Sequence, residues 1–160
     1  MKFPRTVRLD GSDLEIFETA AAPGEWAVPG SFAFADNEPE RLERKARLAF
    51  AGGWLGTESF GWSSLVEVAE IDEADFFRLV ERLARHFVEH YGAPDLGAAL
   101  PTARSEADYA AGLCEHGVHT LLALERQVTE AGIAERYRVI TPSRAQDHAQ
   151  IWTLTEDEEG

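Results

Sequence analysis

Histidine and cysteine are the residues in this sequence whose spacing could support chemistry. His86 and His90 are four residues apart, which places both side chains on the same side of a helix. The single cysteine, Cys114, is followed closely by His116 and His119. Imidazole nitrogen and thiolate sulfur are the ligands that zinc and similar divalent metals prefer. The five residues therefore form a candidate metal site, provided that the two groups meet in the folded chain.

The same five residues also have a structural interpretation, which the sequence favours. The chain has no Cys-x-x-Cys pair and no His-Glu-x-x-His motif, and Cys-x-His-x-x-His matches no established metal-ligand spacing. A lone cysteine commonly packs as a small core residue, and histidines commonly lie at the surface or at its boundary. The two interpretations differ in whether the side chains converge to about 2.0–2.3 Å from a common ion.

Other residue patterns in the chain do not form a catalytic motif. The glycine-rich run at 52–56 follows a predicted helix and lacks the Lys-Ser/Thr pair of a phosphate-binding loop. Residues 60–64 do not form the Gly-x-Ser-x-Gly elbow of serine hydrolases, and residues 10–13 provide too few oxygen ligands for a calcium loop. The sequence therefore favours a non-catalytic protein over an enzyme.

The charge of the chain limits its partners. Its 160 residues carry a formal net charge of −14, from 29 acidic and 15 basic residues. A surface with this charge repels phosphate backbones, so we expect no nucleic-acid binding, and it attracts basic partners and cations. Most aromatic residues would pack in the core, although Trp54 and Trp62 lie near glycines and could line a pocket or a dimer interface. We expect a protein partner, and a homodimer is one form of that association.

The composition also predicts the compartment. An apolar content of 44% is typical of a globular chain. No stretch approaches about 18 consecutive apolar residues, so we expect no membrane span. The basic residues near the start are not followed by an apolar segment, so we expect no secretory signal. A single cysteine excludes an internal disulfide and fits a reducing compartment. These features predict a cytoplasmic protein.

The best-defined local pattern lies at 58–92 and would position His86 and His90. Large apolar residues alternate with small or polar ones over 58–71, which is typical of a half-buried strand. Asp72 then provides a helix cap with Asp75 three residues later, and an apolar stripe at helical spacing continues to Tyr91. Gly92 suits the left-handed residue that ends a helix.

The remaining elements follow from similar patterns. We predict further strands at 3–9, 14–17, 25–35, 119–128 and 133–140, and further helices that begin at Asn37 and Ser105 and end at Gly52 and Gly117. The fold class is therefore α+β, a mainly antiparallel sheet of five to six strands with three helices packed on it. We expect a single domain over 1–140 and a polar, acidic tail over 141–160, with a short docked strand near 150–154.

Several stretches together resemble an uncharacterised bacterial family, a domain of unknown function. The resemblance is carried by residues 2–10, 25–28, 32–36, 56–62 and 82–88, and it extends over nearly the whole chain to about Ile140. It implies no activity and transfers no catalytic residue. It does imply an association with accessory factors of molybdenum-dependent, formate-dehydrogenase-like enzymes.

Two functions are consistent with these observations. We favour a non-catalytic cytoplasmic accessory or protein-interaction domain that assists a metalloenzyme. The alternative is a small metal- or ligand-binding enzyme that uses the group of His86, His90, Cys114, His116 and His119, which would hold a divalent metal such as zinc. For the favoured function we expect no cofactor.

Overall fold

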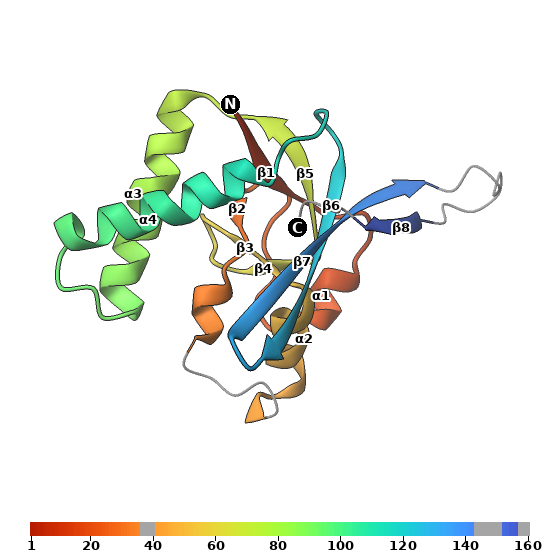
Figure 1. Cartoon of the computed structure of the whole chain (residues 1–160), viewed down its shortest axis with the longest axis horizontal. Helices are drawn as coiled ribbons and strands as arrows, with labels where there is room; N and C mark the ends of the chain where they lie inside the picture. Colours follow the sequence, from red (N-terminus) through yellow and green to blue (C-terminus); the bar gives the residue numbers. More distant parts are fainter. Residues whose placement is uncertain (36–40, 143–151, 157–160) are drawn as a thin grey trace.

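Two antiparallel sheets and four α-helices make up the part of the chain that the computed structural model describes, residues 1–35, 41–142 and 152–156 (Figure 1). The larger sheet has the order β1 (Lys2–Val7), β5 (Leu65–Glu70), β6 (Leu121–Thr129), β7 (Gly132–Pro142) and β8 (Trp152–Glu156). The smaller sheet has the order β2 (Ala27–Val28), β3 (Trp54–Gly56) and β4 (Trp62–Ser63). The predicted α+β class with a mainly antiparallel sheet is confirmed.

The helices fall into two groups. The long helices α3 (Glu73–His90) and α4 (Leu96–Gly112) cross on one side of the molecule (Figure 1). The short helices α1 (Ser12–Ile16) and α2 (Arg44–Gly52) lie near the β6–β7 hairpin (Figure 1). A 3-10 helix, η1 (Ser31–Phe34), follows β2. None of the helices in the described ranges is long and apolar enough to span a membrane.

Helix α3 forms as the sequence predicts. The carboxylate of Asp72 accepts a hydrogen bond of 2.7 Å from the backbone N–H of Asp75. The helix ends at His90, and Gly92 has the expected positive φ of 76°. Its apolar stripe is buried and consists of Phe76, Leu79, Val80, Leu83, Ala84 and Phe87.

Helix α4 begins at Leu96, earlier than the predicted helix start at Ser105. Asp95 caps the helix by accepting a hydrogen bond of 2.8 Å from the N–H of Ala98, and Pro101 lies inside the helix. The helix also ends at Gly112, before the predicted stop at Gly117. Its buried face is a row of small residues, Ala99, Ala103, Ala107 and Ala110, and α4 packs with this face in the same core cluster as α3.

The strand predicted at 58–71 is two strands in different sheets. Strand β4 pairs with β3, whereas β5 pairs with β1 and β6. The break falls at Ser64, whose Oγ donates a hydrogen bond of 2.6 Å to Asp13, a buried carboxylate in α1. A side-chain contact from a distant segment therefore interrupts a pattern that looks continuous in the sequence.

One other strand prediction is wrong, and another is correct only in part. Residues 14–17 do not form a strand, because residues Ser12–Ile16 form α1. The strand that pairs with β1 is β5. Of the segment 25–35, only Ala27–Val28 is a strand, because Gly30 adopts a φ of 81° and the chain then turns into η1. The predicted start of a helix at Asn37 lies outside the described residues, and α2 begins at Arg44.

The strands predicted at 119–128 and 133–140 are present as β6 and β7, which form a hairpin and pair from Leu121↔Ile140 to Thr129↔Gly132. Strand β8 then pairs with β7 from Pro142↔Trp152 to Arg138↔Glu156. It overlaps the segment near 150–154 where the sequence predicts a docked strand. The division into a domain over 1–140 and a tail stays a prediction.

Arg126 in β6 joins the hairpin to α2 and the smaller sheet. Its buried guanidinium donates hydrogen bonds to the carbonyls of Ala49 (3.2 Å) and Phe50 (3.0 Å) at the end of α2, and to the carbonyl of Pro29. Its Nε also donates to Glu135 in β7 at 3.1 Å. The buried charge is thus paired with a carboxylate and each of its three nitrogens donates a hydrogen bond, which stabilises a buried cation.

Candidate functional site

Cys114 lies just after α4 and is buried, with an exposed fraction of 3%. It belongs to a core cluster with Trp54, Leu122 and Tyr137. Burial raises the pKa of the Cys114 thiol to about 12, and nearby Lys2 offsets only part of this effect. The thiol therefore stays protonated at neutral pH, and a protonated thiol is a poor metal ligand and a poor nucleophile.

The two histidines that follow Cys114 occupy different surroundings. The backbone carbonyl of His116 accepts a hydrogen bond of 2.7 Å from the ammonium of Lys2. His119 is exposed, has a positive φ of 74°, and places Nδ1 3.5 Å from a carboxylate oxygen of Glu67 in β5.

The described residues contain no group of three or more His, Cys, Asp or Glu side chains placed to hold a metal ion. Zinc binding by His86, His90, Cys114, His116 and His119 stays a prediction. A native mass spectrum of the untagged protein before and after chelation tests it directly.

His86 and His90 do lie side by side on α3, with ring centroids 4.8 Å apart. The ring of His86 also stacks parallel on the ring of Phe60, at a centroid distance of 3.7 Å. Burial is the main cause that lowers the pKa of His86, repulsion from His90 lowers it further, and attraction to Glu89 opposes both. His86 is therefore biased toward its neutral form.

The loop that carries Phe60 is held by a buried carboxylate. One oxygen of Glu25 accepts hydrogen bonds from the N–H groups of Glu58 (3.0 Å) and Ser59 (2.7 Å). The other oxygen accepts from the N–H of Ala22 and the hydroxyl of Ser59, both at 2.7 Å. Phe60 itself has a φ of 54°, an unfavourable backbone conformation for a bulky residue. The Glu25 contacts hold the loop in which this conformation occurs.

Tyr91 connects the histidine pair to a second aromatic group. Its ring centroid is 5.5 Å from His86, 5.3 Å from Phe32 and 6.1 Å from Phe87. Phe32 and Phe87 are 4.9 Å apart. The planes of Phe32, Phe87 and Tyr91 are nearly perpendicular to one another, with interplanar angles of 84° to 90°, the edge-to-face arrangement that aromatic rings favour.

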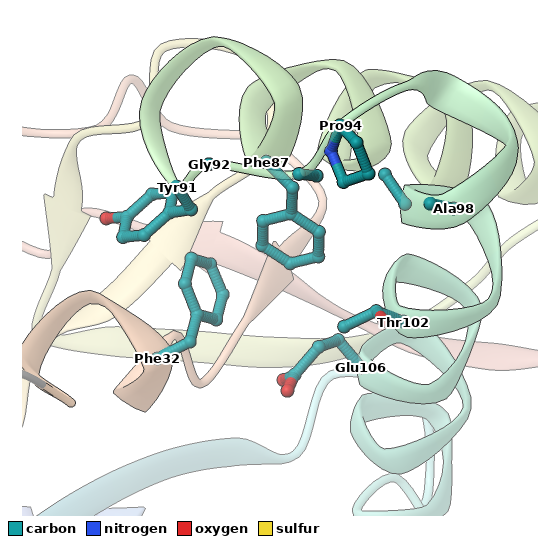
Figure 2. A pocket seen from close by; sticks show the side chains of 10 residues that line it. Phe32, Phe87, Tyr91, Gly92, Pro94, Ala98, Thr102 and Glu106 are labelled. Carbon is teal, nitrogen blue, oxygen red and sulfur yellow. The ribbon is translucent and has the colours of Figure 1, made fainter.

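These three rings form one wall of a pocket of about 370 Å³ (Figure 2). The pocket lies between η1, the C-terminal end of α3, the turn at 92–94 and one face of α4. Its lining residues are Phe32, Phe87, Tyr91, Gly92, Ala93, Pro94, Ala98, Ala99, Thr102 and Glu106. Ala98, Thr102 and Glu106 follow one another at intervals of four residues, so they share one side of α4.

Glu106 is the acidic group of the pocket, and Figure 2 shows its carboxylate on the side opposite Pro94. Its side chain is half-buried, and within the described ranges it forms no hydrogen bond and no ion pair. Burial raises the pKa of Glu106, and repulsion from Glu135 raises it further. The pocket thus combines an aromatic wall with one carboxylate that has no hydrogen-bond or ion-pair partner among the described residues.

Sequence reasoning missed this pocket. Phe87 and Tyr91 were recognised only as part of the apolar stripe of α3, and Phe32 was placed in a strand. Glu106 was one of 29 acidic residues, with no local signal to distinguish it. The contacts of η1 and of α4 with α3 bring these side chains together.

A family model described as "Family of unknown function (DUF6505)" matches residues 1–157. The match confirms the resemblance to a family without an assigned activity. No curated protein and no solved structure matches the chain.

Proposed function

The chain therefore belongs to this family of unknown function, and we propose that it is a non-catalytic accessory or protein-interaction domain. In this proposal the partner inserts a side chain with an apolar body into the pocket between α3 and α4. A cytoplasmic location, expected from the single cysteine, is part of the proposal. That the partner is a metalloenzyme or one of its accessory factors rests on the sequence resemblance alone.

The observation that carries the proposal is the pocket itself. Its volume of about 370 Å³ is at the lower end of the range for ligand pockets, roughly 300 to 1,000 Å³, and it suits one large side chain. Its aromatic wall offers apolar contact area, and pockets of this kind receive the anchor residues that dominate many protein interfaces.

The lining residues favour binding over catalysis. Of the ten that line the pocket, Tyr91 and Glu106 have titratable side chains, and burial raises the pKa of each. General acid–base catalysis near neutral pH needs a group whose pKa lies close to that pH and that reaches the reacting atom. Tyr91 is a phenol whose pKa is raised further from neutrality. The pKa of Glu106 is raised toward neutrality, but the ten lining residues include no His, Cys or Lys that could act with it as a catalytic pair.

Filling the pocket tests the proposal. The probe is Nα-acetyl-norleucine N-methylamide, a blocked residue with an unbranched apolar side chain, titrated into ¹⁵N-labelled protein. We expect amide shifts at the end of α3 and along α4. Ala98→Trp, at an exposed lining position, should abolish them, whereas Ser105→Trp, at an exposed α4 position outside the lining, should preserve them.

Two results would contradict the proposal. Amide shifts that are unchanged in Ala98→Trp would place the binding site elsewhere. A wild-type dimer that Ala98→Trp converts to a monomer, measured by light scattering, would make the occupant a second copy of this chain and not a separate partner.

A further inference from the structure

We infer that the partner side chain is a lysine or an arginine, and that Glu106 binds its cationic head while the aromatic wall contacts its apolar stem. The inference rests on the proposed function and specifies the chemistry of the occupant.

The first argument is the unused carboxylate. Glu106 is half-buried against an apolar cavity and, within the described ranges, has neither a donor nor a cation as a partner. A carboxylate in such surroundings loses part of its hydration without compensation. A hydrogen bond from a donor on the ligand therefore contributes more binding free energy here than at an exposed carboxylate. Hydrogen bonds between charged groups are also the strongest that proteins make.

The charged residues near Glu106 do not provide it with a positive partner. Glu135, whose charge raises the pKa of Glu106, already accepts hydrogen bonds from Arg126 at 3.1 Å and from the hydroxyl of Tyr137 at 2.7 Å. Glu135 is therefore already paired with Arg126, the buried cation of this region, and its negative charge repels that of Glu106. A second positive charge, supplied from outside, would relieve that repulsion.

The second argument is the aromatic wall. Lysine and arginine have an apolar stem of three or four methylene groups behind a charged head, and such stems pack along apolar surfaces. Phe32, Phe87 and Tyr91 provide that surface on the side of the pocket formed by η1 and α3. Aromatic rings also attract a cation that comes within about 6 Å of a ring centre.

The third argument concerns the sign of the charge. The pocket lies between the C-terminal end of α3, which favours cations, and the N-terminal end of α4, which favours anions. The carboxylate of Asp95 already caps the N-terminal end of α4. The effects of the two helix ends therefore oppose each other, and Glu106 determines which ligand charge the pocket prefers. Its negative charge favours a cation, and so does the net charge of −14 of the chain. An acidic side chain would be repelled.

The test compares two probes that differ in charge. Nα-acetyl-lysine N-methylamide and its norleucine counterpart are titrated into ¹⁵N-labelled full-length protein at low salt. We expect the lysine probe to bind about tenfold more tightly, in line with a hydrogen bond to a charged group. Glu106→Gln should remove this preference and leave norleucine binding intact. Glu115→Gln, which removes one negative charge from an exposed position outside the pocket, should retain the preference.

The outcomes separate the inference from the proposed function. Equal binding of the two probes to the wild-type pocket, or a lysine preference that survives Glu106→Gln, would overturn the inference and leave docking of an apolar side chain intact. No amide shift with either probe would overturn both. Circular dichroism of each variant confirms that the fold is retained.

Discussion

The imidazole ring of His86 in α3 lies parallel to the phenyl ring of Phe60, with the two centroids 3.7 Å apart. Phe60 belongs to the loop between β3 and β4 and reaches this position with a φ of 54°. The stack therefore joins the end of α3 to the smaller sheet. Since Tyr91 contacts both His86 and Phe32, the same aromatic group continues into the pocket.

Removing the Phe60 ring should change the titration of His86. Burial is the main cause of the lowered pKa of His86, so Phe60→Ala should expose the imidazole and raise its pKa toward the ordinary value of 6.5. Proton NMR of the imidazole C–H signals over pH measures this value. Phe77→Ala, at an exposed position of the same helix, is the control and should leave the pKa of His86 unchanged. An unaltered His86 pKa in Phe60→Ala would show that the stack does not desolvate the ring.

Glu106 should make the stability of the fold depend on pH. The folded state raises the pKa of this carboxyl above its ordinary 4.5, so folding favours the protonated form. The stabilising contribution of the bound proton is therefore present below the unfolded pKa and is lost as the pH rises through the folded pKa.

Glu106→Gln removes this dependence. Relative to wild type, the variant should gain stability as the pH rises above 4.5, by less than about 1 kcal/mol because solvent screens a half-exposed carboxylate. Urea unfolding on both sides of this pH measures the difference, and Glu115→Gln is the matched control. A constant difference between wild type and Glu106→Gln at every pH would contradict the argument.

Cys114 should react with thiol reagents only when the protein unfolds. Its exposed fraction is 3% and burial raises the pKa of its thiol to about 12, so the reactive thiolate is scarce and shielded in the folded state. Labelling with a disulfide reagent at neutral pH should be slow in buffer and complete in urea, at one thiol per chain. Rapid labelling of the folded protein would place Cys114 in an accessible site and revive its candidacy as a metal ligand.

Local signals explain which elements could be predicted from the sequence. The cap of Asp72 and the stop at Gly92 depend on contacts within a few residues, and both are present. The proximity of His86 and His90 follows from helical spacing alone. In contrast, the start of α4 was missed because Pro101 and the small residues around it resemble a loop, whereas burial against α3 stabilises them as a helix.

Tertiary contacts explain what the sequence could not predict. The break between β4 and β5 depends on Asp13, which lies 51 positions from Ser64. The pocket depends on Phe32, which a 3-10 helix carries to the end of α3. Whether Cys114 can bind a metal ion depends on its burial, which raises the pKa of its thiol. None of these relationships leaves a periodic pattern in the chain.

Glu25 should be essential for the loop that presents Phe60. Its two oxygens accept hydrogen bonds from three backbone N–H groups and one hydroxyl, and the residue is 2% exposed. In Glu25→Gln the new NH₂ group must face at least one of these N–H donors, which loses its acceptor without access to water. We expect a loss of about 1–3 kcal/mol in the free energy of unfolding, measured with urea.

The control and the second measurement distinguish a local role of Glu25 from a general loss of charge. Glu58→Gln makes the same chemical change in the same loop, but Glu58 is exposed and pairs with Arg82 at 3.5 Å, so its loss should cost less than about 1 kcal/mol. Glu25→Gln should also raise the pKa of His86, because a loosened loop releases the ring of Phe60 from the imidazole. A Glu25→Gln protein with wild-type stability and an unchanged His86 pKa would mean that the loop holds Phe60 without this carboxylate.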